Sequence, residues 1–127
     1  APMIEQLKAK LERRTAKAKL DDDLLERRAR ALNRAHFDGA LEWTSIRWVS
    51  NQNKRVGSCT PSNGTIRISH RVAEMPTFVR DYVIVHELAH LVEPNHSKKF
   101  WQLVIKYPRT ERARGYLMAL GAEPLDD

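Results

Sequence analysis

A short HExxH pattern carries the residue types of a metal-dependent hydrolytic site: His86, Glu87 and, after two apolar residues, His90. On a helix, His86 and His90 lie one turn apart on the same face, where two imidazoles can bind one tetrahedral metal ion. Glu87 follows the first histidine and can act as general base towards a metal-bound water, whose pKa the ion lowers. The pattern therefore predicts hydrolysis at a metal site, with Zn²⁺ as the ion.

The surroundings of this pattern favour a metal site over a chance match. Between Phe78 and Val92 the only other charged side chains are Arg80 and Asp81. Burial of two imidazoles and a carboxylate in such an apolar helix is costly unless these groups have partners. A metal ion and a polarised water would supply them.

Two residues beyond the pattern are candidates for the third ligand. Glu93 continues the same helical face one turn beyond His90. His96 would point away from the metal on a continued helix, but Pro94 disfavours helix before it, and the turn can bring His96 back. Neutral imidazole suits zinc, so we prefer His96 as the ligand and Glu93 as a helix-end or supporting carboxylate.

The remaining histidines and the single cysteine are expected to play minor roles. His36 is expected to end a helix, where a cation is favoured, and His70 to lie at the surface after a strand. Cys59 cannot form an internal disulfide. No pairing with a histidine is apparent from the sequence, so Cys59 is expected to be a small buried thiol and not a nucleophile.

The elements that must position these residues can be read from hydrophobic periodicity and turn signals. β-branched and aromatic residues, separated by turn formers, predict strands that form a small antiparallel sheet. The predicted fold is α+β, with this sheet packed on a buried HExxH helix, and with N-terminal and C-terminal helices. The predicted helices cover residues 3–19, 21–35, 76–93 and 98–107, with a last one from Pro108 to about Gly121, and the predicted strands cover 41–50, 55–60 and 65–69.

Length and charge predict one domain over residues 1–127, made of basic N-terminal helices (1–37) and the segment with the sheet and the later helices (41–121). The net charge of +6 comes largely from the N-terminal part. We interpret it as a solvated helix face, with weak nucleic-acid association as the alternative, because no nucleic-acid-binding motif accompanies it. The absence of a signal peptide and of a membrane span predicts a cytoplasmic protein without a membrane partner.

Several segments together resemble the YgjP-like metallopeptidase family, which is close to the SprT-like and WLM groups of small zincins. The resemblance extends over about residues 47–120 and leaves out the basic N-terminal helices. An Asn-His-Ser segment followed by Phe-Trp, at this distance from HExxH, is its most specific part. The matching segments are residues 55–59, 64–68, 82–91 and 95–101, together with Pro76 and Pro108.

This resemblance implies a zincin-like fold with zinc on His86, His90 and His96, and with Glu87 as the catalytic residue. It also implies peptide or protein substrates and a strand at residues 65–69 that could pair with an extended substrate. The sequence departs from the family at two positions, which are listed here with the usual residue: Val56 for Trp and Ser69 for Asn.

Peptide-bond hydrolysis is therefore the leading functional hypothesis, with Tyr116, Arg114 and His70 as candidate donors to the developing oxyanion. A metal-dependent nuclease is an alternative, because three histidines at this spacing also resemble the YbeY-type ribonucleases. Those enzymes lack the glutamate after the first histidine, so Glu87 disfavours this alternative. A nucleic-acid-associated zinc protein without peptidase activity is a further alternative, which the basic charge permits.

Overall fold

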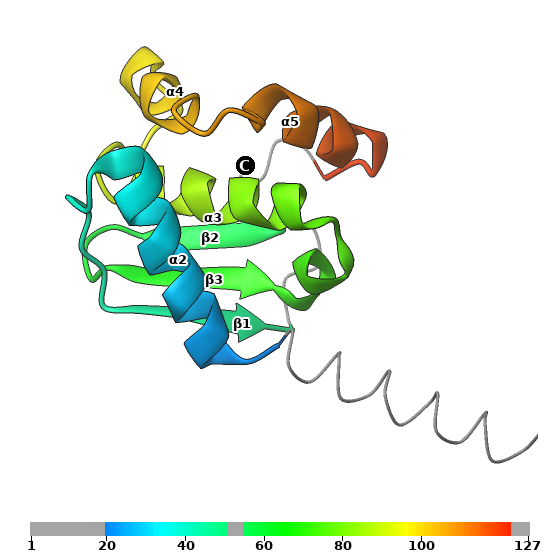
Figure 1. Cartoon of the computed structure of the whole chain (residues 1–127), viewed down its shortest axis with the longest axis horizontal. Helices are drawn as coiled ribbons and strands as arrows, with labels where there is room; N and C mark the ends of the chain where they lie inside the picture. Colours follow the sequence, from blue (N-terminus) through cyan, green and yellow to red (C-terminus); the bar gives the residue numbers. More distant parts are fainter. Residues whose placement is uncertain (1–19, 51–54, 123–127) are drawn as a thin grey trace, which may run out of the picture.

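The computed structural model describes residues 20–50 and 55–122, and the predicted helix over residues 3–19 lies outside this part. Its elements combine helices with a three-stranded sheet (Figure 1). In chain order they are α2 (Asp22–Phe37), β1 (Ser45–Val49), β2 (Gly57–Thr60), β3 (Thr65–Ser69), the 3₁₀ helix η1 (His70–Glu74), α3 (Thr77–His90), α4 (Lys98–Val104) and α5 (Thr110–Ala119).

The sheet has the strand order β1-β3-β2 and is mixed, so the prediction of an antiparallel sheet was wrong for one of its two pairings. β2 and β3 form an antiparallel pair, whereas β1 is parallel to β3, with Ser45 opposite Thr65. Two hydrogen bonds explain this arrangement: Thr44 donates its backbone N–H to Gly64 O and its hydroxyl to Asn63 O, each over 2.7 Å. They hold the start of β1 beside the turn that leads into β3, so both strands run in the same direction.

Helix α3 lies between the sheet and the helices α4 and α5 (Figure 1). It begins after Pro76, and every residue from Asp81 to His90 is buried, as its apolar sequence predicts. The helix ends at His90 and not at the predicted Glu93. The carbonyl of Glu93 lies 3.0 Å from Nδ1 of His90, and the chain must leave the helical path to bring it there.

Two of the helices, α2 and α4, have clear sequence signals at their starts. Asp21 caps α2 by accepting hydrogen bonds from the backbone N–H groups of Asp23 and Leu24. Ser97 caps α4 by accepting a hydrogen bond from the backbone N–H of Phe100. α4 is shorter than its predicted range of 98–107 and ends at Val104, after which the chain turns towards α5.

The short helix η1 was not predicted, and Ser69 accounts for it. The Ser69 hydroxyl accepts from Arg71 N over 3.2 Å and caps η1, so this departure from the family pattern has a local structural role. Val56, the other departure, is fully buried in the hydrophobic core.

Among the described helices, none is both long and apolar enough to cross a bilayer.

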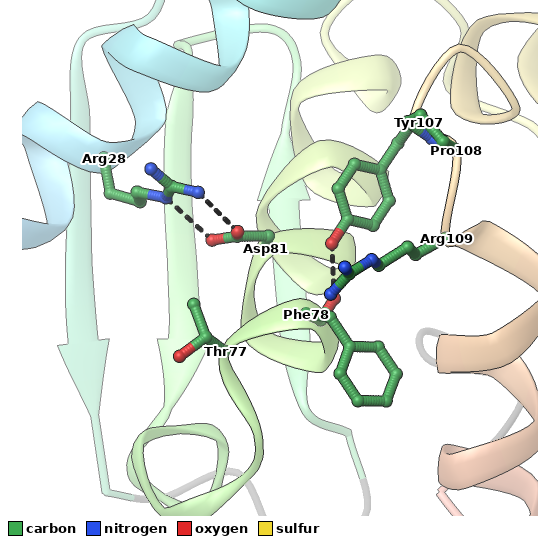
Figure 2. Close-up of a pocket in the computed structure, with 7 residues that line it drawn as sticks. All are labelled: Arg28, Thr77, Phe78, Asp81, Tyr107, Pro108 and Arg109. Carbon is green, nitrogen blue, oxygen red and sulfur yellow. Dashed lines mark hydrogen bonds and ion pairs between the residues drawn. The ribbon is translucent and has the colours of Figure 1, made fainter.

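An ion pair joins α2 to the first turns of α3 (Figure 2). Arg28 donates from Nε and from a terminal nitrogen to the two carboxylate oxygens of Asp81, over 2.9 and 2.6 Å. The hydrogen bond to Asp81 raises the pKa of the Arg28 guanidinium above its ordinary value. This two-point contact fixes α2 against the first turns of the buried helix.

The same ion pair borders a cavity of about 340 Å³ that also contacts the start of α3 and the loop between α4 and α5. Across this cavity, the Tyr107 hydroxyl donates to Phe78 O over 2.8 Å (Figure 2). Burial raises the pKa of Tyr107, and the negative charge of Asp81 raises it further, so the hydroxyl keeps its proton and remains a donor. These contacts connect α2, the start of α3 and the loop between α4 and α5 around the cavity.

Replacing Arg28 with Ala is expected to lower the free energy of unfolding by about 1–2 kcal/mol, because it leaves the Asp81 carboxylate buried without its cation. The effect stays below that of a fully buried pair because the Arg28 side chain is 44% exposed. Urea denaturation measures it. The matched control is Arg30→Ala on the same helix, which breaks the exposed pair with Glu26 and is expected to cost about 0.5 kcal/mol. Equal losses in both variants would contradict the structural role of the pair.

Candidate metal site

Three histidines from two segments come together at the end of α3. His86 and His90 lie on the helix, and His96 lies on the loop that leads to α4. One ligand nitrogen from each lies within 4.8 Å of the others, and Nε2 of His90 is 3.2 Å from Nε2 of His96. Zinc–nitrogen bonds around a tetrahedral ion place ligand nitrogens about 3.3 Å apart, so small ring rotations bring all three to that spacing. The geometry therefore fits a single ion.

The second ring nitrogen of each helical histidine already has a partner. Nδ1 of His86 lies 3.2 Å from the Tyr82 hydroxyl, and Nδ1 of His90 lies 3.0 Å from Glu93 O. Histidines that bind a metal commonly donate from the other ring nitrogen to such a group, which fixes the ring. This pattern leaves Nε2 of both rings as the ligand atom. Glu93 thus supports the site through its backbone carbonyl, while its carboxylate is outside the cluster.

An aromatic wall from α4 encloses the imidazoles. The Phe100 ring is fully buried and stacks on His90 at a centroid distance of 4.3 Å. It also lies 4.9 Å from His86 and 5.0 Å from His96. The Trp101 ring is 6.0 Å from both of these histidines. Aromatic packing holds the rings in place and keeps water from their apolar sides.

Glu87 points from the same helix towards the start of β2. It is fully buried, and the position that a Cβ atom would occupy at Gly57 is only 2.9 Å from its Oε2. Glu87 follows the first histidine and is buried, and its role as general base towards a metal-bound water stays a prediction. The closeness of β2 to this carboxylate had no signal in the sequence, because it depends on strand order.

The other residues considered from sequence are not members of the histidine cluster. His36 is in the last turn of α2, as predicted, with its ring edge-on to Tyr107 at 5.4 Å. His70 is exposed on η1. Arg114 stacks on Trp101 at 4.4 Å, and Tyr116 packs against the core. Which of the three candidates, Arg114, Tyr116 or His70, donates to a substrate oxygen stays a prediction.

A small cavity of about 160 Å³ opens beside His90, between β2 and the turn after α3. Cys59 is partly buried and contributes to its wall. Since β3 is paired on both sides, the strand addition expected at residues 65–69 is wrong. β2 is an edge strand of the described sheet, and it borders this cavity. The cavity is lined by Arg55, Ser58, Cys59, Pro61, His90 and Pro94.

Comparison with known proteins agrees with this geometry. The profile of a family described as YgjP-like, metallopeptidase domain, matches residues 2–119. The chain belongs to this family. The YgjP-like match starts at residue 2, so it includes the basic N-terminal part that the resemblance from sequence left out. Membership in a metallopeptidase family implies a bound metal ion and peptide or protein substrates.

A solved structure resembles the chain in fold. It is the crystal structure of the metallopeptidase zymogen of Pyrococcus abyssi abylysin, with a TM-score of 0.65 and 22% identity. The match covers 75% of this chain and 92% of that chain. It confirms the predicted α+β, zincin-like fold for this YgjP-like chain. No protein with a curated description matches the sequence.

Proposed function

We propose that the chain is a zinc-dependent peptidase in which His86, His90 and His96 bind the ion and Glu87 is the general base. The observation that carries this proposal is the convergence of three imidazole nitrogens within 4.8 Å, next to a fully buried carboxylate. An all-imidazole donor set suits zinc. Three protein ligands also leave a fourth position open, as in catalytic and not structural zinc sites.

The chain's own residues have distinct tasks in this reaction. When bound, zinc polarises the scissile carbonyl and makes a water more acidic. Glu87 takes the proton from the attacking water and delivers it to the leaving amine. Tyr82 and the carbonyl of Glu93 hold the helical imidazoles in orientation through Nδ1. Phe100 excludes water from the apolar side of the rings.

The substrate would lie along β2. Its outer edge faces away from β3 in the described sheet, and the cavity of about 160 Å³ next to His90 can receive one side chain. An extended peptide that pairs with an edge strand gains main-chain hydrogen bonds, and pockets for alternate side chains give selectivity. We therefore propose strand addition at β2 in place of β3.

Removal of the metal tests the proposal directly. The purified chain is expected to contain one zinc ion, measured by elemental analysis, and to cleave an unstructured protein such as casein. A chelator is expected to abolish cleavage, and stoichiometric zinc to restore it, because the carbonyl loses its polarising ion. Zinc is also expected to raise the melting temperature, since an ion that binds only the folded state stabilises it. Cleavage that persists in the metal-free chain would contradict the proposal.

Two of the four arginines on α2 have acidic partners within the protein. Arg28 pairs with Asp81, and Arg30 pairs with Glu26. These partners neutralise part of the charge that a nucleic acid would otherwise attract.

A further inference from the structure

We infer that Gly57 is a positioning residue, whose missing side chain provides the space that the Glu87 carboxylate occupies. The inference about catalysis rests on the proposed role of Glu87 as general base. The contact itself does not depend on that role, and it can be tested without activity.

The evidence is the close approach of β2 to α3. A Cβ atom added at Gly57 would lie 2.9 Å from Oε2 of Glu87 and 3.1 Å from its Cγ. It would also lie 3.2 Å from Cγ1 of Val83. The 2.9 Å separation is shorter than real Cβ atoms show, and the other two are a few tenths of an ångström below ordinary contact, so an added methyl group must displace its neighbours.

Backbone conformation does not explain the glycine. The described glycines with positive φ are Gly39, Gly64 and Gly121, so Gly57 has a backbone that alanine also adopts. An alanine at this position is therefore opposed by its contacts with neighbouring side chains and not by torsion strain. This distinguishes Gly57 from glycines that serve a turn.

The packing around Gly57 holds both backbones in place, so the contact with an added methyl group would be relieved by movement of the Glu87 carboxylate. The strand cannot move away easily, because Gly57 is paired with the fully buried Ile68 and follows the fully buried Val56. The backbone of α3 is buried along its whole second half. Since close-packed interiors yield little, the Glu87 side chain is the part that must rotate.

Rotation of this carboxylate would affect chemistry but not metal binding. A general base must lie within hydrogen-bonding reach of the proton it takes, and a misplacement of about 1 Å can cost about 100-fold in rate. The cluster formed by His86, His90 and His96 involves other side chains. Gly57→Ala is therefore expected to lower kcat about 10- to 100-fold, with KM and zinc content unchanged.

The matched control for this variant is Gly115→Ala on α5, where an added Cβ meets nothing within 4 Å. Its kcat is expected to equal that of the wild type. Equal kcat values for Gly57→Ala and Gly115→Ala would overturn the inference. Loss of zinc from Gly57→Ala would also overturn it, because the glycine would then support the metal site as a whole.

A double-mutant cycle tests the contact without any activity. Gly57→Ala is expected to lower the melting temperature of the wild type by about 4 °C or more beyond its effect in the Glu87→Ala background, where the contacts with Oε2 and Cγ of Glu87 are absent. Equal shifts in both backgrounds would overturn the inference, including when Gly57→Ala is too unstable for kinetics. If the shifts differ but the wild type cleaves no peptide, the placement of Glu87 stands and the proposed function fails.

Discussion

Replacement of Glu87 by Gln is expected to lower kcat for peptide cleavage by about 1,000-fold and to leave zinc content unchanged. The amide keeps the size of the side chain in its buried site but cannot accept the proton of the attacking water. Positioned general bases contribute about 10²- to 10⁴-fold, and this one is also proposed to return the proton to the leaving group. Steady-state kinetics on the zinc-loaded protein, with elemental analysis of the same sample, measures both quantities.

The matched control for this variant is Glu42→Gln, which makes the same chemical change at an exposed position before β1. It is expected to retain wild-type kcat. Wild-type activity in Glu87→Gln would rule out Glu87 as the base. Loss of zinc in that variant would instead indicate that the Glu87 carboxylate is needed for metal binding.

Replacement of His96 by Ala is expected to weaken zinc binding by about 100-fold or more. A structural zinc site with four ligands is worth about 10–16 kcal/mol, which corresponds to roughly 3 kcal/mol for each ligand. The His96 nitrogen belongs to the cluster, and His96 is the proposed ligand that comes from outside α3. Competition with a chromophoric chelator measures the affinity.

Two controls separate the ligand from its neighbours. Glu93→Gln keeps the backbone carbonyl that contacts His90, and the Glu93 carboxylate is outside the cluster, so zinc affinity is expected to be unchanged. His70→Ala removes an exposed imidazole from η1 and is also expected to have no effect. If Glu93→Gln weakens zinc binding as strongly as His96→Ala does, the ligand assignment is wrong.

Local patterns predicted the parts of the fold that depend on neighbouring residues in the chain. The burial of α3 followed from its apolar circumference, and the shared face of His86 and His90 followed from helical spacing. The return of His96 followed from the break that Pro94 imposes. In each case the deciding residues lie within a few positions of one another, where backbone geometry alone fixes their relation.

The parts that could not be predicted depend on contacts between distant segments. Alternation of residue types shows which face of a strand is buried, but it gives no information on the direction of the neighbouring strand. The parallel pairing of β1 with β3 rests on hydrogen bonds from Thr44 to the turn before β3. Because sequence patterns do not show contacts between distant segments, they could not predict that β2 lies beside Glu87, and therefore could not suggest the proposed role of Gly57.

The central position of β3 also sets an order in which this chain can fold. β2 and β3 are joined by a short turn and can pair by local closure, whereas β1 needs a partner that lies later in the chain. During synthesis, α2 and β1 leave the ribosome before β3 exists, so β1 can contact α2 early but gains the pairing of Ile46 with Ile66 only after β3 has been made. The pairing of β1 therefore depends on the later part of the chain, which also carries His86, His90 and His96.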